Sequence, residues 1–111
     1  MNSDDSIDAI FSALSDRTRR QVLGRLARAD SVTATELATG MDVSRQAIVK
    51  HLQALSSAGF ATTERSGREV RYSLDPAPLR EAARWISDEG ARWDDRLGRL
   101  RSLLQDRPGR T

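Results

Sequence analysis

Two helix starts with a tight turn between them constrain this chain more than any other feature of its sequence. Thr33 is followed by Glu36, a spacing typical of a capping box, in which each side chain satisfies a backbone amide of the other residue. Residues 40–43 (GMDV) predict a compact turn that begins with glycine, a frequent helix terminator. Ser44 then caps the next helix. A short helix, a turn and a longer helix are therefore predicted over about residues 33–58.

A β-hairpin is predicted directly after these two helices. Gly59 ends the longer helix, and the residues beyond it alternate in polarity, as strands do, on both sides of the turn at Ser66 and Gly67. The hairpin occupies about residues 60–75. A hairpin in this place forms the wing of a winged helix-turn-helix.

Further helices are predicted on both sides of this unit. Apolar residues at helical spacing indicate one helix at about residues 4–15, a second after the cap at Asp16, and a long last helix at about residues 77–105. The predicted order is ααααββα, a mainly α chain with a small β-hairpin. A length of 111 residues suits a single domain, so residues 1–111 are expected to form one winged helix-turn-helix domain.

Positive charge is concentrated in the middle of the chain. Residues 1–15 carry three aspartates and no base, residues 16–72 carry ten Lys or Arg against six acids, and residues 73–111 carry eight against seven. This distribution suggests a nucleic-acid partner, although an ordinary solvated surface would also be basic in places. Charge alone does not distinguish a nucleic-acid-binding surface from an ordinary solvated one, so the sequence motifs are needed.

The longer helix of the pair has a polar and basic outer face. When Ile48 is set toward the core, steps of 100° per residue turn Leu52 and Leu55 inward as well. In a helix-turn-helix the N-terminal end of this helix meets the base edges of the major groove. The residues predicted to contact DNA from this helix are Ser44, Arg45, Gln46, Val49, Lys50 and Gln53.

Different roles are expected within this set. Arg45 and Gln46 suit bidentate hydrogen bonds to guanine and adenine, whereas Lys50 suits a phosphate. Val49 would either touch a thymine methyl group or pack at the edge of the core. Ser44 would either donate to a phosphate in addition to capping its helix, or act as a cap only.

Three arginines surround the predicted wing tip: Arg65, Arg68 and Arg71. A basic hairpin tip beside a recognition helix can flank or enter the adjacent minor groove. About two of the three are expected to reach DNA, with Arg68 the first choice.

The last helix is too long for a domain of this size. At 1.5 Å per residue it spans about 43 Å, so part of it is expected to need a partner. The predicted homodimer interface consists of Ile7, Phe11, Leu79, Ile86, Trp93, Leu97 and Leu100. Core burial is an equally open alternative for Trp93, and Gly90 marks either a kink or a close helix crossing.

Residues 14–20 (LSDRTRR) and 43–52 (VSRQAIVKHL), with the glycine-arginine wing, resemble the arsenic-resistance-regulator (ArsR) family. The resemblance covers residues 7–104. It implies a homodimeric winged-helix repressor that binds an imperfect palindrome in double-stranded DNA and often releases it when an effector binds. The sequence does not identify an effector. Residues 79–86 (LREAARWI), followed by Trp93 and by Arg96-Leu97, resemble more closely the branch without a known metal ligand, whose members look like autorepressors.

The inventory of reactive side chains argues against a metal switch and against catalysis. Metal-sensing members place cysteines on the third helix or at the N-terminus, or Asp and His ligands on the last helix, but this chain has no cysteine and its only histidine is His51. No metal, no cofactor and no enzyme activity are therefore expected, since no nucleophile, carboxylate pair or phosphate loop is recognisable. The absence of a membrane-length apolar run and of a basic leader predicts a cytoplasmic protein. The rival function is a winged-helix module that binds another protein.

Overall fold

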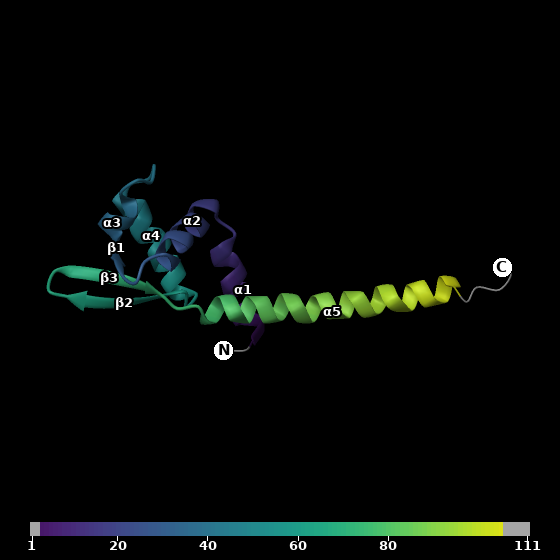
Figure 1. Ribbon diagram of the computed structural model, residues 1–111. Coiled ribbons are helices and arrows are strands. Elements are labelled where there is room, and N and C mark those ends of the chain that lie inside the picture. The colour runs from purple at the N-terminus through teal and green to yellow at the C-terminus, as the bar shows by residue number, and fades with distance from the viewer. Residues whose placement is uncertain (1–2, 106–111) are drawn as a thin grey trace.

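Helices form most of the chain, and one of them extends far beyond the others (Figure 1). The computed structural model describes residues 3–105; the outer ends of the predicted domain, residues 1–2 and 106–111, lie outside the described residues. The elements are α1 (Ser3–Leu14), α2 (Arg17–Ala27), β1 (Val32–Thr33), α3 (Ala34–Ala38), α4 (Arg45–Ser57), β2 (Ala61–Ser66), β3 (Glu69–Leu74) and α5 (Ala77–Gln105). The predicted mainly α winged helix-turn-helix is confirmed.

Side-chain caps fix where the helices of this motif begin. Thr33 Oγ1 accepts from the Glu36 amide at 3.1 Å, and Glu36 Oε1 accepts from the Thr33 amide at 3.1 Å, so the predicted capping box is formed. Ser44 Oγ accepts from the Ala47 amide at 3.1 Å at the start of α4. Each cap satisfies amides that the first helical turn leaves without a partner.

The end of α4 is equally well defined. The Phe60 amide donates to the Leu55 carbonyl at 2.9 Å, and the Gly59 amide donates to the Ser56 carbonyl at 3.0 Å. Gly59 has a φ of +86°, a left-handed conformation that glycine adopts without steric cost. This pair of bonds is the Schellman ending, and it turns Phe60 back into the core, where it is fully buried.

The core lies between the motif helices, α2, α1 and the base of the hairpin. Ile48, Leu52 and Leu55 of α4 are fully buried, as predicted from their helical spacing. Val22 and Leu26 of α2 are also fully buried and belong to the same cluster. With its inner side fixed in this way, α4 has a defined outer side.

The wing is part of a three-stranded antiparallel sheet in the described region, with the order β1-β3-β2. The β2–β3 hairpin was predicted and is confirmed, but the two-residue strand β1 was not foreseen. It pairs Val32 with Tyr72 and Thr33 with Arg71, so it attaches the base of the wing to the start of α3. The correction to the predicted order is this additional strand.

The last helix, α5, leaves the body and continues on its own. It is continuous through Gly90, so the glycine does not interrupt it. Phe11 of α1 packs edge-on against Trp85 of α5, with ring centroids 5.5 Å apart, and this contact holds the first half of α5 against the body.

The length of α5 makes the molecule extended. The radius of gyration is 20.6 Å, against about 13 Å expected for a compact chain of this length. Within the described part of the chain no helix is long and apolar enough to cross a membrane.

Candidate nucleic-acid interface

The outer face of α4 presents the polar side chains predicted from the sequence. Arg45, Gln46, Lys50 and Gln53 are all exposed. Burial of Ile48, Leu52 and Leu55 on the opposite side fixes the rotation of α4 about its axis. The four polar side chains therefore face solvent. Ser44 is exposed as well, and its hydroxyl already caps the helix.

Two residues on the flank of this face have a more structural setting. Arg45 Nε donates to Thr35 Oγ1 at 3.1 Å, a bond that joins α4 to α3 across the turn. Val49 is partly buried and packs against the core cluster, in agreement with the core-edge alternative. Val49 also lines the groove beside the wing.

The wing, the start of α3 and the first half of α4 line a groove of about 610 Å³. Arg45 and Val49 of α4 line it together with Arg68 from the wing turn. Gly67, with a φ of +62°, makes that tight turn possible. The fold thus brings Arg45, Val49 and Arg68 into one concave surface. Arg65 is exposed on β2.

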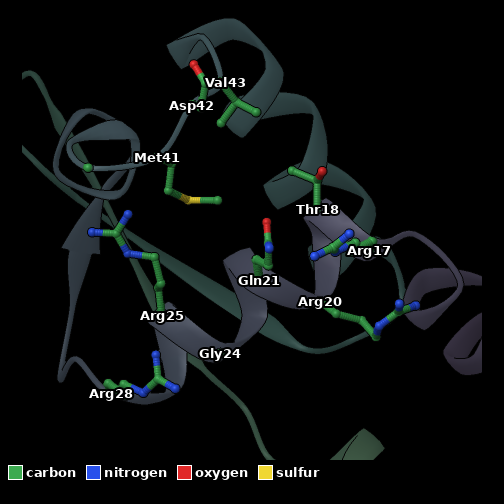
Figure 2. Close-up of a pocket in the computed structure, with 11 residues that line it drawn as sticks. Arg17, Thr18, Arg20, Gln21, Gly24, Arg25, Arg28, Met41, Asp42 and Val43 are labelled. Carbon is green, nitrogen blue, oxygen red and sulfur yellow. The ribbon is translucent and has the colours of Figure 1, made fainter.

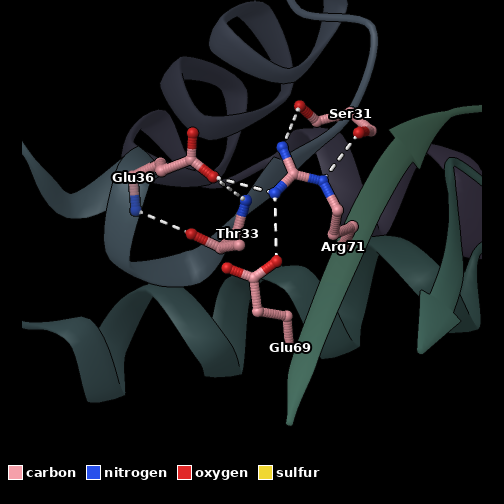
Figure 3. Close-up of polar contacts among 5 residues, drawn as sticks. All are labelled: Ser31, Thr33, Glu36, Glu69 and Arg71. Atoms are coloured by element: carbon pink, nitrogen blue, oxygen red, sulfur yellow. Dashed lines mark hydrogen bonds and ion pairs between the residues drawn. The ribbon is translucent and has the colours of Figure 1, made fainter. Parts of the chain in front are cut away.

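Arg71 has a different environment from the other wing arginines (Figure 3). Its Nε donates to Ser31 Oγ at 2.9 Å, and one of its terminal nitrogens donates to the Ser31 carbonyl at 3.1 Å. The other terminal nitrogen lies 3.4 Å from carboxylate oxygens of both Glu36 and Glu69. The guanidinium therefore braces the wing against β1 and α3, a role that competes with the predicted DNA contact.

The helix caps also shift two carboxyl groups. The backbone hydrogen bond from Thr33, together with its hydroxyl and the nearby Arg71, lowers the pKa of Glu36 below its usual value. The backbone hydrogen bond from Arg19 lowers the pKa of Asp16, the cap of α2, in the same way. Both groups are thereby held in the charged form that the caps require.

A second basic surface lies beside the helix-turn-helix (Figure 2). It is an open groove of about 850 Å³ between α2 and the α3–α4 turn, with four arginines and one aspartate in its lining. The lining residues are Arg17, Thr18, Arg20, Gln21, Gly24, Arg25, Arg28, Gly40, Met41, Asp42 and Val43. The turn residues of this arginine groove, Met41, Asp42 and Val43, directly precede the cap of α4 at Ser44 in the chain.

The four groove arginines are not equivalent. Arg25 donates to the Leu37 carbonyl at 2.9 Å and to the Thr39 carbonyl at 2.8 Å, which closes the C-terminal end of α3. Arg20 donates to the carbonyl of Leu14. By contrast, no side-chain bond to another residue in the described range 3–105 occupies the exposed guanidinium groups of Arg17 and Arg28.

Sequence reasoning missed Arg17 and Arg28 as site residues. They are eleven positions apart, which returns a helix to within about 20° of the same face. The spacing of the two arginines can be read from the sequence, but only the fold shows that their face of α2 lies beside the α3–α4 turn.

The predicted dimer residues fall into two groups. Ile7 is only 9% exposed and Phe11 packs on Trp85, so these α1 residues contact α5 or the body of their own protomer. The α5 residues differ, because they are large, apolar and exposed. They are Leu79, Ile86, Trp93, Leu97 and Leu100.

The expectation of a metal-free protein remains a prediction. Among residues 3–105, no three His, Cys, Asp or Glu side chains are grouped so that they could hold a metal ion. His51 is partly buried, and its Nδ1 has no hydrogen-bond partner in that same range.

The capped helix pair, the exposed basic face of α4 and the wing arginine beside it define a winged helix-turn-helix DNA-binding protein. Comparisons with known proteins support the same class. A family model described as a helix-turn-helix domain matches residues 14–64. The transcriptional repressor SdpR of Bacillus subtilis is 34% identical over 77 residues, covering 69% of this chain and 84% of that protein.

Solved structures extend the likeness to almost the whole chain. An ArsR-like transcriptional regulator from Rhodococcus sp. RHA1 is 41% identical with a TM-score of 0.83, covering 93% of this chain and 96% of the other. A homodimeric winged helix-turn-helix DNA-binding domain from Mycobacterium bovis is 26% identical with a TM-score of 0.63, covering 77% and 81%. The chain belongs to the ArsR family of winged helix-turn-helix transcriptional regulators.

Proposed function

We propose that this regulator is a homodimeric repressor that binds a palindromic operator through α4 and the wing. One observation carries the proposal: α4 has exposed polar residues along its outer side and a fully buried apolar stripe along its inner side, and its first turn shares a groove with Arg68 through Arg45. A monomeric body with this face can read only one half-site. Two copies related by a two-fold axis would read both halves of a palindrome.

In the proposed complex the N-terminal part of α4 enters the major groove. Arg45 and Gln46 are then the base-reading residues, and Lys50 contacts a phosphate. Arg68 at the wing tip lies toward the adjacent minor groove. Arg71 supports the wing from behind through Ser31 and the two glutamates.

The arginine groove extends this face along the DNA backbone. Arg17 and Arg28 are exposed cations next to the turn that leads into α4, so a strand entering the α4 site can pass their guanidinium groups. Such contacts are independent of base sequence and add affinity that depends on salt. They would enlarge the footprint without altering the operator sequence.

Dimerisation is the second requirement of the proposal. The exposed apolar residues of α5 continue beyond the body, where one protomer has nothing to cover them with in the described range (Figure 1). A homodimer covers them and places two recognition helices about 34 Å apart, the distance between successive major grooves. The SdpR repressor and the homodimeric domain from M. bovis support repression and pairing by similarity.

A module that binds another protein is the rival function. It would more naturally present apolar or acidic residues where this chain has Arg45, Gln46, Lys50 and Arg68. We also propose that the chain is not an enzyme, needs no metal and acts in the cytoplasm, as its sequence predicts. Zn²⁺ or Ni²⁺ added to the DNA complex should then leave it intact.

A mobility-shift assay with the DNA upstream of the regulator's own gene tests the proposal. We expect a single specific complex that contains two chains per operator, as measured by multi-angle light scattering. Scrambling one half-site should weaken binding far more than scrambling the centre of the palindrome. Binding that is equally weak on every duplex would reject the proposed function.

A further inference from the structure

A hydrogen bond between two helices determines how the Arg45 side chain is presented. Arg45 is the first residue of α4 and is exposed, and its Nε donates to Thr35 Oγ1 of α3 at 3.1 Å. An arginine side chain on a surface ordinarily samples many rotamers, and binding must then immobilise it. The bond to Thr35 restricts this freedom before any DNA is bound.

The bond occupies one defined edge of the planar guanidinium. An arginine guanidinium carries one N–H on Nε and two on each terminal nitrogen. In Arg45 the Nε hydrogen is used by Thr35, and within residues 3–105 neither terminal nitrogen has a hydrogen-bond or ion-pair partner. The end edge, formed by the two terminal nitrogens, therefore stays free for a fork of two hydrogen bonds. Guanine O6 and N7 accept such a fork in the major groove.

Thr35 is itself held in place by the structure of α3. The capping box of Thr33 and Glu36 fixes the start of this helix, and Thr35 is its second residue. The Thr35 carbonyl accepts from the Thr39 amide at 3.2 Å and from Thr39 Oγ1 at 3.1 Å. Because threonine is branched at Cβ, its side chain has few rotamers. The Thr35 hydroxyl is thus a fixed point against which the guanidinium of Arg45 is oriented.

A hydroxyl holds Arg45 without cancelling its charge. Two carboxylates, Glu36 and Glu69, line the same groove as Arg45, and an ion pair with either would compete with DNA for the guanidinium. Both carboxylates are instead paired with Arg71, each at 3.4 Å (Figure 3). Arg45 is bonded to the neutral Thr35, so it keeps its full charge for DNA.

We propose that Thr35 is a positioning residue for base recognition: its hydroxyl orients Arg45 so that the two terminal nitrogens read a guanine in each half-site. This inference rests on the proposed function and deepens it, because it names a residue outside α4 that sets the base preference. Thr35, Arg45 and Arg68 line one groove, so the bond lies on the side of the motif that the proposed complex turns to DNA. Thr35 itself contacts no base.

Competition binding of the full-length protein to duplexes with single base substitutions in the operator tests this role. Thr35→Val removes the hydroxyl but keeps the branched shape and a similar helix propensity. It should weaken binding to the operator about fivefold for each half-site, the loss of one ordinary hydrogen bond. The loss should appear as a flatter preference at one position, the position that Arg45→Ala also affects. On a duplex in which that guanine is replaced, Thr35→Val and the wild type should bind alike.

Three further measurements separate positioning from a structural role. Thr35→Ser keeps the hydroxyl and should retain the guanine preference. Thr39→Val removes a hydroxyl that bonds to the Thr35 carbonyl and not to Arg45, so it should leave the base preference unchanged. In the Arg45→Ala background, Thr35→Val should have no further effect, because the residue through which Thr35 acts is already lost.

Three results would overturn the proposal. A guanine preference that is lost in Arg45→Ala but kept in Thr35→Val would show that Arg45 reads the base without Thr35. A loss of the same size on every duplex for Thr35→Val would make Thr35 a structural residue. A lower salt slope for Arg45→Ala with unchanged base preference would make Arg45 a phosphate contact. All three leave the proposed function intact, whereas a wild type that shows no preference among the duplexes would reject both.

Discussion

Replacing Arg17 and Arg28, the two groove arginines without side-chain hydrogen bonds in the described range, should make DNA binding less dependent on salt. Each phosphate neutralised by a protein cation contributes about 0.9 to the slope of log K against log salt. Arg17 and Arg28 occur twice in a dimer, so the double variant Arg17→Ala/Arg28→Ala loses up to four contacts and a slope of about 3.6. Between 50 and 200 mM salt, the wild type should lose about 150-fold more affinity than the variant.

Fluorescence anisotropy over a salt series measures this slope directly. Neither guanidinium has a hydrogen-bond partner in the described range, so the variant should keep the wild-type melting temperature. The double variant Arg80→Ala/Arg84→Ala is the matched control, since it removes the same charge from exposed positions on α5. On a duplex trimmed to the operator, the salt slopes of the wild type and the groove variant should differ less than they do on a long duplex. Equal slopes for the groove and control variants on long duplexes would refute a backbone path through the groove.

Three further predictions concern the scaffold that holds the site. Leu52→Ala, at a fully buried position of α4, should lower the free energy of unfolding by about 2–5 kcal/mol in urea titrations, and a loss below 1 kcal/mol would contradict the described core. Thr33→Ala should cost about 1 kcal/mol in the same assay, and an unchanged midpoint would show that the capping box is not formed in solution. The depressed pKa values of Asp16 and Glu36 imply stability that is complete above their usual values of 3.8 and 4.5 and is lost as the pH falls through the lower folded values. Glu36→Gln should therefore show a shallower loss of stability below pH 4.5, and an acid unfolding curve parallel to the wild type would contradict this role.

Local rules were sufficient to predict the helix-turn-helix from the sequence. The caps at Thr33 and Ser44 and the glycine ending at Gly59 depend on neighbours within five positions, and all three form as expected. The inward stripe of α4 followed from helical spacing alone, and so did its outward polar face.

The features that were missed depend on contacts between distant residues. Strand β1 has only two residues and exists because β3 lies beside it, so periodicity had too few positions to detect it. Arg71 was grouped with the wing tip by its sequence position, but two of its hydrogen bonds go to Ser31, forty positions away. The arginine groove needs α2 and the α3–α4 turn side by side, which only the tertiary structure provides.

Competition binding against a set of operators with single base substitutions tests the docking of α4 most directly. We expect Gln46→Ala to change the base preference at one position in each half-site while its salt slope stays that of the wild type. Lys50→Ala should weaken binding to every duplex by a similar factor and reduce the salt slope by about 1.8, since the dimer loses two phosphate contacts. Unaltered base preference in the first variant together with an unaltered salt slope in the second would contradict the central claim that α4 reads the operator through this face.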